Sequence, residues 1–316
     1  MRSSRSGLRI SPSSDARVRA FALTGKTIRI WLDSARPKTL PAAIAPVLIG
    51  AAMAYGAGHW QGWVFAAIVF SAVCIQIGTN YANDYFDFIK GADRDDRVGP
   101  TRATATGLVT PPQMLMATII TFGFATLAGL CLVWVGGLPI LLIGLASIVS
   151  GVLYTAGPYP LGYVGLGDLF VLVFFGPVAV GGTYYLLADS IEPEAIVAGL
   201  APGLIATGIL AVNNVRDRQA DEAAGKKTLA VRFGHGFGVA EYVFCLLGGV
   251  SVPAWLVIAT RGHGYCLLAL LALVPAAFLI RKMIQRPDPT TLNAMLGQTG
   301  RLLIIYSVLF SVGWVL

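Results

Sequence analysis

The chain has 316 residues, of which 56% are hydrophobic and only 12% are charged, and its formal net charge is +7 at pH 7. Soluble domains carry about 25% charged residues, so this composition excludes an ordinary soluble protein and places the chain in lipid. The excess of Lys and Arg lies in the polar segments that flank the apolar stretches, so we do not interpret it as a nucleic-acid-binding surface.

Apolar stretches of about 20 residues are long enough to cross a hydrocarbon core of roughly 30 Å. In chain order, the sequence predicts nine such helices, at residues 39–57, 60–82, 112–134, 138–156, 165–187, 193–215, 238–260, 264–281 and 297–316. Open sheets would leave backbone groups unpaired in lipid, and these runs are longer than barrel strands of about 10 residues. We therefore predict an all-α, polytopic membrane bundle over residues 39–316.

Basic residues support the count of nine helices. With nine spans, every Lys and Arg except Arg261 falls in the N-terminal segment, in loops on the same side of the membrane, or, for Arg281 and Arg301, within five residues of such a loop. Positively charged loops remain in the cytoplasm, so we expect a multi-pass protein of the cell (inner) membrane with a cytoplasmic N-terminus. Residues 1–38 are rich in Arg and Ser and lack an apolar core, which indicates a partly disordered tail, with an organelle transit peptide as the alternative.

Polar residues gather at the cytoplasmic ends of the second and sixth predicted helices. Carboxylates near membrane depth are costly and usually mark function. The first cluster, GTNYANDYFDFIKGADRDDR, contains Asn80, Asn83, Asp84, Asp87, Lys90, Asp93, Arg94, Asp95, Asp96 and Arg97. The second, within AVNNVRDRQADEAAGKKTLAVRFG, contains Asn213, Asn214, Arg216, Asp217, Asp221, Glu222, Lys226 and Lys227.

Each cluster holds an Asn, an Asp four residues later, and a second Asp three or four residues beyond that. These six residues are Asn80, Asp84, Asp87, Asn213, Asp217 and Asp221. Helical positions three and four apart share a face, and the second and sixth helices run in the same direction, so the two acidic faces end at one depth and can converge. A solvated helix end explains either cluster alone, but it does not explain the repeated spacing.

Several carboxylate and amide oxygens suit Mg²⁺, which typically binds one or two carboxylates and completes its shell with water and substrate phosphate oxygens. Cationic side chains in the same clusters can balance the charge of a departing diphosphate. The candidates are Lys90, Arg94, Arg216, Lys226 and Lys227. The sequence therefore predicts a site for Mg²⁺ bridged to a diphosphate.

Two further segments supply candidates for the substrate cavity. Arg36 and Lys38 precede the first span, where basic anchors are also expected. Residues 154–168, YTAGPYPLGYVGLGD, form a loop that begins with Tyr154, ends at Asp168 and has no other charged residue. This loop suits an acceptor-binding rim, although a tight Gly/Pro turn accounts for much of its composition.

At these residues the sequence resembles the UbiA superfamily of intramembrane aromatic prenyltransferases. The resemblance covers most of the chain, in ARPKTLPAAIAPVLIG (35–50), QIGTNYANDYFDFIKGAD (76–93), GPTRATATGL (99–108), YTAGPYPLGYVGLGD (154–168) and NNVRDRQADEAAGKKTLAVRFG (213–234). The first Asp-rich segment and GPTRAT, which contains Arg102, favour the branch that prenylates naphthoates. One departure is that Asp87 follows Asp84 by three residues, where many relatives have four, which leaves open whether Asp87 or a neighbour is the closer ligand.

The resemblance implies a nine-helix bundle around a central cavity, with both Asp motifs holding Mg²⁺ and a polyprenyl diphosphate, in membrane lipid. It further implies transfer of the polyprenyl group to 1,4-dihydroxy-2-naphthoate with loss of CO₂ and diphosphate, giving demethylmenaquinone. Arg102 is then a further candidate for the cavity. The alternatives are another acceptor such as 4-hydroxybenzoate, a phytyl donor, or a secondary transporter. The sequence does not indicate an oligomeric state.

Overall fold

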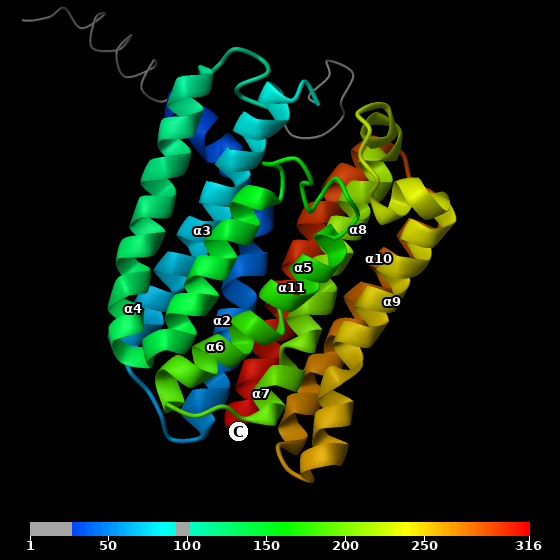
Figure 1. Cartoon of the computed structure of the whole chain (residues 1–316). Coiled ribbons are helices and arrows are strands. Elements are labelled where there is room, and N and C mark those ends of the chain that lie inside the picture. The colour runs from blue at the N-terminus through cyan, green and yellow to red at the C-terminus, as the bar shows by residue number, and fades with distance from the viewer. Residues whose placement is uncertain (1–26, 93–101) are drawn as a thin grey trace, which may run out of the picture.

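The computed structural model describes residues 27–92 and 102–316, and these residues form a bundle of helices without strands (Figure 1). The predicted all-α membrane fold is confirmed. Arg94 and the acidic residues that surround it in the first cluster lie outside the described residues, as do residues 1–26.

The helices are η1 (Pro37–Thr39), α2 (Leu40–Gly56), α3 (Gly62–Ile89), α4 (Pro111–Leu153), α5 (Gly167–Phe174), α6 (Pro177–Ala188), α7 (Pro193–Ala198), α8 (Leu200–Ala223), α9 (Leu229–Thr260), η2 (Gly264–Ala272), α10 (Leu273–Ile284) and α11 (Pro289–Val315). A short helix over residues 27–34 precedes them.

Helix α4 forms a hairpin and supplies two spans. Its 43 residues would extend about 65 Å if straight, roughly twice the thickness of the hydrocarbon core. Gly137 breaks the helix with φ 65° and ψ −150°, and the two arms lie side by side (Figure 1). A Cβ added to Gly151, on the second arm, would lie 3.6 Å from the Phe122 ring on the first.

Eight helices within the described ranges are long and apolar enough to cross a membrane. The α4 hairpin accounts for the ninth span, because it contains the helix predicted at 112–134 and all but the last three residues of the helix predicted at 138–156. Two other spans are interrupted, between α5 and α6 and between α7 and α8. The interruptions contact each other, since a Cβ on Gly199 would lie 2.7 Å from the Pro177 Cα.

Several helices extend beyond their apolar stretches. Helix α3 continues to Ile89 and α8 to Ala223, seven or eight residues past the predicted ends, so both polar motifs are helical. Helix α11 begins eight residues before its predicted start. The Asp288 carboxylate caps it by accepting N–H bonds from Thr290 and Thr291, and hydrogen bonds with Thr291 lower the pKa of Asp288.

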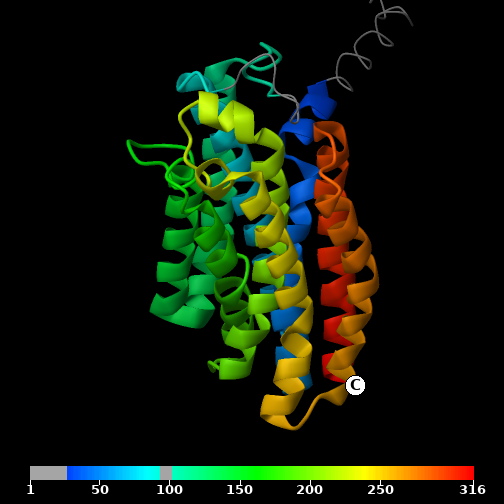
Figure 2. The same cartoon turned by 90° about the vertical axis from the view of Figure 1, so that its right-hand side faces the viewer.

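Helices α3 and α8 both end at the same end of the bundle, which we call the motif end. The C-terminus of the protein lies at the opposite end in both views (Figures 1 and 2). The short helix over residues 27–34 packs on α3 at the motif end, with the Trp31 and Tyr81 rings 5.7 Å apart. This part of the N-terminal segment is therefore ordered against the bundle.

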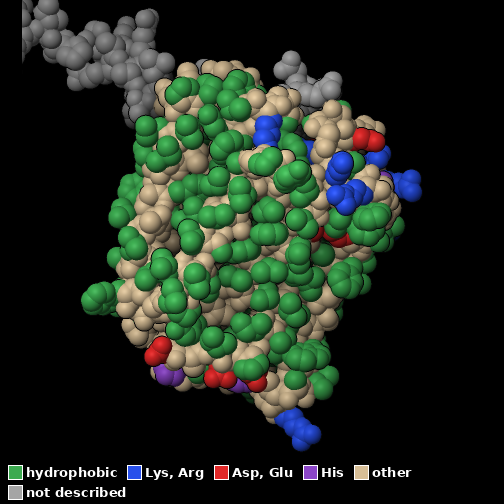
Figure 3. Space-filling view, viewed as in Figure 1, with side chains coloured by type: hydrophobic (Ala, Val, Ile, Leu, Met, Phe, Trp, Pro, Cys, Tyr) green, Lys and Arg blue, Asp and Glu red, His purple; other side chains and the backbone are tan. Residues whose placement is uncertain are grey.

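The lateral surface is apolar. Figure 3 shows hydrophobic side chains over the middle of the bundle, with charged groups mainly toward its ends. Large side chains such as Trp134, Ile258 and Phe278 are exposed along the spans. Contact with lipid tails accounts for this exposure, because a water-facing surface of this extent would drive aggregation.

Candidate functional site

A cavity of about 640 Å³ opens among α2, α3, α4, α5, α6 and α8. Toward the motif end its wall is polar, with Asn80, Asn83, Asp87, Arg102, Asn213, Asn214, Asp217, Asp221, Lys226 and Asn293. Further in, the wall is apolar, with Ile68, Leu132, Ile140, Ile143, Val178 and Leu186. The cavity thus combines a site for a charged group with space for a hydrocarbon tail.

Helix α3 presents Asn80, Asn83 and Asp87 to the cavity. Each helical residue is rotated by about 100° from the last, so these three positions fall within about 60° of one another. Asn80 donates from Nδ2 to the Ala35 carbonyl at 2.9 Å and to Thr39 Oγ1 at 3.1 Å. Asn83 Oδ1 accepts from Thr155 Oγ1 at 3.0 Å.

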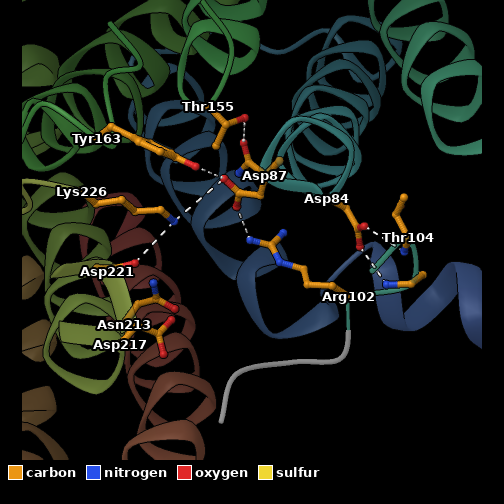
Figure 4. Close-up of polar contacts among 12 residues, drawn as sticks. Asp84, Asp87, Arg102, Thr104, Thr155, Tyr163, Asn213, Asp217, Asp221 and Lys226 are labelled. Atoms are coloured by element: carbon orange, nitrogen blue, oxygen red, sulfur yellow. Dashed lines mark hydrogen bonds and ion pairs between the residues drawn. The ribbon is translucent and has the colours of Figure 1, made fainter. Parts of the chain in front are cut away.

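Asp84 faces a different way. Its carboxylate is 2% exposed and accepts the backbone N–H groups of Ala103 and Thr104, each at 3.1 Å. Figure 4 shows it turned from Asp87 toward Thr104. Asp84 is not among the cavity-lining residues, so the structure does not bring this predicted metal ligand to the other carboxylates.

Asp87 is 2% exposed and contacts side chains from several parts of the chain. Arg102 Nη2 donates to its Oδ2 at 2.5 Å. Tyr163 donates its hydroxyl to Oδ1 at 2.8 Å, and Lys226 Nζ lies 3.9 Å from the same oxygen. Three separate parts of the protein therefore meet at one side chain (Figure 4).

Helix α8 contributes Asn213, Asp217 and Asp221, as the sequence predicts. Arg216 Nε and Nη2 each lie 2.7 Å from an oxygen of the adjacent Asp217 carboxylate. The same guanidinium donates to Asn213 Oδ1 at 2.7 Å and to Asn293 Oδ1 at 3.2 Å, on α11. Arg216 itself lies behind the cavity wall, so it holds these groups in place from outside.

Lys226 connects the two helices that carry the motifs. Its Nζ lies 3.4 Å from Asp221 Oδ1 and 3.9 Å from Asp87 Oδ1. The Tyr163 ring supports it, with Nζ 4.8 Å from the ring centroid, which is within the range of cation–π contact. The two acidic faces therefore converge on one cation, as the shared helix direction predicts.

Each of the three motif carboxylates that line the cavity has a basic partner within the protein: Arg102 or Lys226 for Asp87, Arg216 for Asp217 and Lys226 for Asp221. No three His, Cys, Asp or Glu side chains within residues 27–92 and 102–316 converge as a ready metal cage. The donors still suit Mg²⁺, which uses few carboxylates and takes the remaining oxygens from water and substrate phosphate.

The remaining predicted diphosphate ligands lie at the edge of this site. Lys90 is exposed, donates to the Gly157 carbonyl at 2.9 Å and lies 5.0 Å from the Tyr163 ring centroid. Partial burial lowers the pKa of Lys90, nearby Asp87 opposes that shift, and Lys226 adds to it. Lys227 is exposed outside the cavity lining, and its backbone N–H donates to the Tyr163 carbonyl at 2.7 Å.

Among the predicted acceptor-site residues, Arg36, Lys38, Arg102 and Tyr154 all line the cavity. Burial holds the pKa of Tyr154 well above its usual range, and the carboxylates of Asp168, Asp221 and Asp87 act in the same direction. Tyr154 is therefore held as a neutral phenol.

Asp168 lies behind the cavity wall. Its Oδ1 is 3.5 Å from Asn214 Nδ2, and its carboxyl hydrogen-bonds Glu241 on α9. Both acidic residues line a second, apolar cavity of about 450 Å³ at the outer side of α8. Asp168 therefore lines this second cavity and not the one that Arg36, Lys38, Arg102 and Tyr154 line.

Sequence analysis did not single out Asn83, Tyr163 and Asn293 as site residues. Asn83 precedes Asp87 by four residues, the spacing that also separates Asn213 from Asp217, so this signal was present in the sequence. Tyr163 carried a weaker signal as one of three tyrosines in a Gly/Pro-rich loop. Asn293 lies far along the sequence on α11, and no local pattern marks it.

The sequence matches the UbiA prenyltransferase family over residues 43–308. It is 39% identical, over 90% of this chain and 94% of the relative, to the 1,4-dihydroxy-2-naphthoate octaprenyltransferase of Escherichia coli (strain K12). It is 44% identical to the enzyme of the same name from Mycobacterium tuberculosis (strain ATCC 25618 / H37Rv), over 71% of this chain and 82% of the relative.

Solved structures share the fold. A UbiA homolog from Archaeoglobus fulgidus superposes with a TM-score of 0.63 at 14% identity, over 89% of this chain and 99% of that one. The same homolog bound to DMAPP and Mg²⁺ gives a TM-score of 0.58 at 16% identity, with the same coverage. From the sequence match over most of its length, the chain belongs to the UbiA prenyltransferase family.

Proposed function

We propose that this protein transfers a polyprenyl group from polyprenyl diphosphate to 1,4-dihydroxy-2-naphthoate, releasing diphosphate and CO₂ and giving demethylmenaquinol, the reduced form of demethylmenaquinone. The observation that carries the proposal is the convergence of Asp87 and Asp221 on Lys226 at the head of a long apolar cavity. The names of the relatives at 39% and 44% identity support the naphthoate acceptor.

The polar end of the cavity suits the diphosphate. Asn83, Asp87, Asn213, Asp217 and Asp221 are the residues that would hold Mg²⁺, which supplies positive charge to the leaving diphosphate when bound. Arg102 and Lys226 line the same wall. Their fixed charges favour the diphosphate more as its allylic C–O bond breaks and negative charge accumulates on the leaving group.

The apolar and aromatic walls exclude water from the allylic cation that this bond cleavage leaves. An electron-rich ring carbon of the acceptor then forms the new C–C bond. Loss of the carboxyl group as CO₂ returns its bonding electrons to the ring and restores aromaticity. The protein needs only to position the reactants and keep water out, which agrees with Tyr154 being held neutral.

We further propose that the motif end faces the cytoplasm. Apart from Arg261, the described Lys and Arg residues gather at that end. Arg261 follows α9 at the other end, where Asp189 and Glu192 lie between α6 and α7. Positive loops remain in the cytoplasm. In this orientation the polar end of the cavity is on the side where soluble metabolites are made.

The function can be tested with purified protein in vesicles, with Mg²⁺, a polyprenyl diphosphate and either 1,4-dihydroxy-2-naphthoate or 4-hydroxybenzoate. We expect prenylated product and CO₂ by mass spectrometry with the naphthoate, none with a chelator, and recovery on adding Mg²⁺. Product with 4-hydroxybenzoate alone would overturn the acceptor assignment, and product in chelator would overturn the metal requirement.

The metal site can be tested with two neighbouring carboxylates. Replacing Asp221, which lines the cavity, with Ala should lower kcat/KM at least about 100-fold, because charge stabilisation at the leaving group is lost. Glu222 is exposed at the same helix end, so Glu222→Ala should retain wild-type kinetics. Equal effects of the two substitutions would contradict the proposed site.

The hydrocarbon tail of the donor should occupy the apolar part of the cavity, where Gly182 lies on α6. A Cβ there would lie in ordinary van der Waals contact with Ile143 Cδ1, at 3.7 Å, so Gly182→Leu projects into the cavity. We expect kcat/KM for an octaprenyl donor, relative to geranyl diphosphate, to fall at least about tenfold. Gly123→Leu, on an exposed helical face, is the control, and an unchanged ratio in Gly182→Leu would place the tail elsewhere.

Membrane orientation can be measured with reporter fusions. Alkaline phosphatase fused after Leu316 should be active, and a green fluorescent protein at that position should be dark, because the C-terminus lies opposite the motif end. Fusions after Ala224, at the motif end, should show the reverse. Fluorescence at Leu316 with inactive phosphatase would invert the proposed orientation.

A further inference from the structure

The loop that enters α4 is fixed on α3 by the carboxylate of Asp84. Its Oδ2 accepts the Ala103 N–H and its Oδ1 accepts the Thr104 N–H, each at 3.1 Å. A carboxylate that accepts backbone N–H groups makes charge-assisted hydrogen bonds, which are among the stronger ones in proteins. Both oxygens of Asp84 are therefore engaged with the loop.

The loop is a compact turn over residues 102–109. The Thr106 N–H donates to the Arg102 carbonyl at 3.0 Å, and the Gly107 N–H donates to the Thr104 carbonyl at 3.1 Å. Gly107 has φ +71°, which glycine adopts without strain. Ala103 and Val109 are buried in a small cluster with Tyr81 of α3. Internal bonds and burial together make the turn a rigid unit.

Arg102 is the residue immediately before the two amides held by Asp84. Its side chain is 7% exposed and reaches the cavity, where Nη2 lies 2.5 Å from Asp87 Oδ2. Figure 4 shows the arrangement: Asp84 holds the turn on one side, and Arg102 extends from it to Asp87 on the other. Two carboxylates three residues apart on α3 thus bind the backbone and the side chain of one turn.

We propose that Asp84 is a positioning residue for Arg102 and not a metal ligand. By fixing the turn, Asp84 places the Arg102 guanidinium at the polar wall of the cavity, where it contacts the diphosphate of the donor. This inference rests on the proposed function for the identity of that ligand. The hydrogen bonds that carry it are independent of any substrate.

Kinetics of Asp84→Ala, Asp84→Asn and Arg102→Ala distinguish the two roles. A positioning role predicts that Asp84→Ala and Arg102→Ala each raise the KM for polyprenyl diphosphate at least about tenfold. The Mg²⁺ concentration that gives half the maximal rate should stay within about twofold of the wild-type value. The double variant should be no worse than Arg102→Ala alone, because both substitutions remove the same contact. Asp84→Asn keeps one acceptor oxygen and should lie between Asp84→Ala and wild type.

Hydrogen–deuterium exchange of the peptide over residues 102–109 gives a readout without catalysis. The amides of this turn should exchange faster in Asp84→Ala and Asp84→Asn and keep the wild-type rate in Arg102→Ala. Leu108→Ala, an exposed site in the same turn, is the matched control with wild-type kinetics. If Asp84→Ala does not fold, Asp84→Asn carries both measurements.

Two results would overturn the proposal. One is a rise in the half-saturating Mg²⁺ concentration in Asp84→Ala or Asp84→Asn as large as that in Asp217→Ala. The other is wild-type exchange of the 102–109 peptide in both Asp84 variants. If the wild-type protein gives no product with the naphthoate, the proposed function fails while the exchange experiment still decides the role of Asp84.

Discussion

Carboxylates buried in an apolar bundle need partners, and this requirement shapes the whole motif end. An ionised carboxylate without a partner in a low-dielectric interior costs several kcal/mol. Here Asp84 accepts hydrogen bonds from two backbone amides, and Asp217 binds the adjacent Arg216. Asp87 accepts hydrogen bonds from Arg102 and Tyr163. The partners of Asp84 and Asp87 come from loops at the motif end, whereas Arg216 lies beside Asp217 on α8 itself.

The need for partners also explains why the helices extend past their apolar stretches. Had α3 ended where its hydrophobic run ends, near residue 82, Asp87 would lie in a solvated loop. The extra turns instead keep the polar residues on helices, where their spacing in the sequence decides whether their side chains face the cavity. Loops then contact these polar residues: the 154–168 segment supplies Tyr163, and the 226–228 segment supplies Lys226.

Much of this arrangement could be predicted from the sequence. Hydrophobic runs located every span, and they separated the two arms of α4 although the helix is continuous apart from Gly137. In the second motif, Asn213, Asp217 and Asp221 all face the cavity as their spacing indicates. In the first motif the spacing was ambiguous, because Asn80 with Asp84 and Asn83 with Asp87 repeat it equally well. The choice between them depends on where the 102–109 turn packs, which no local pattern reveals. For the same reason Asn293 was beyond prediction, since its partner Arg216 is 77 residues away.

The contact between Asn80 and the N-terminal segment alters where the functional unit begins. The family match starts at residue 43, and hydropathy places the first span at about residue 39. Yet the cavity wall includes Asp33 and Arg36, and the Asn80 amide is held by the Ala35 carbonyl. A protein trimmed to residues 39–316 would keep α2 to α11 and lose the part of the cavity wall that Asp33 and Arg36 form. The segment before the first span is therefore part of the enzyme, and a boundary drawn by hydrophobicity cuts through the site.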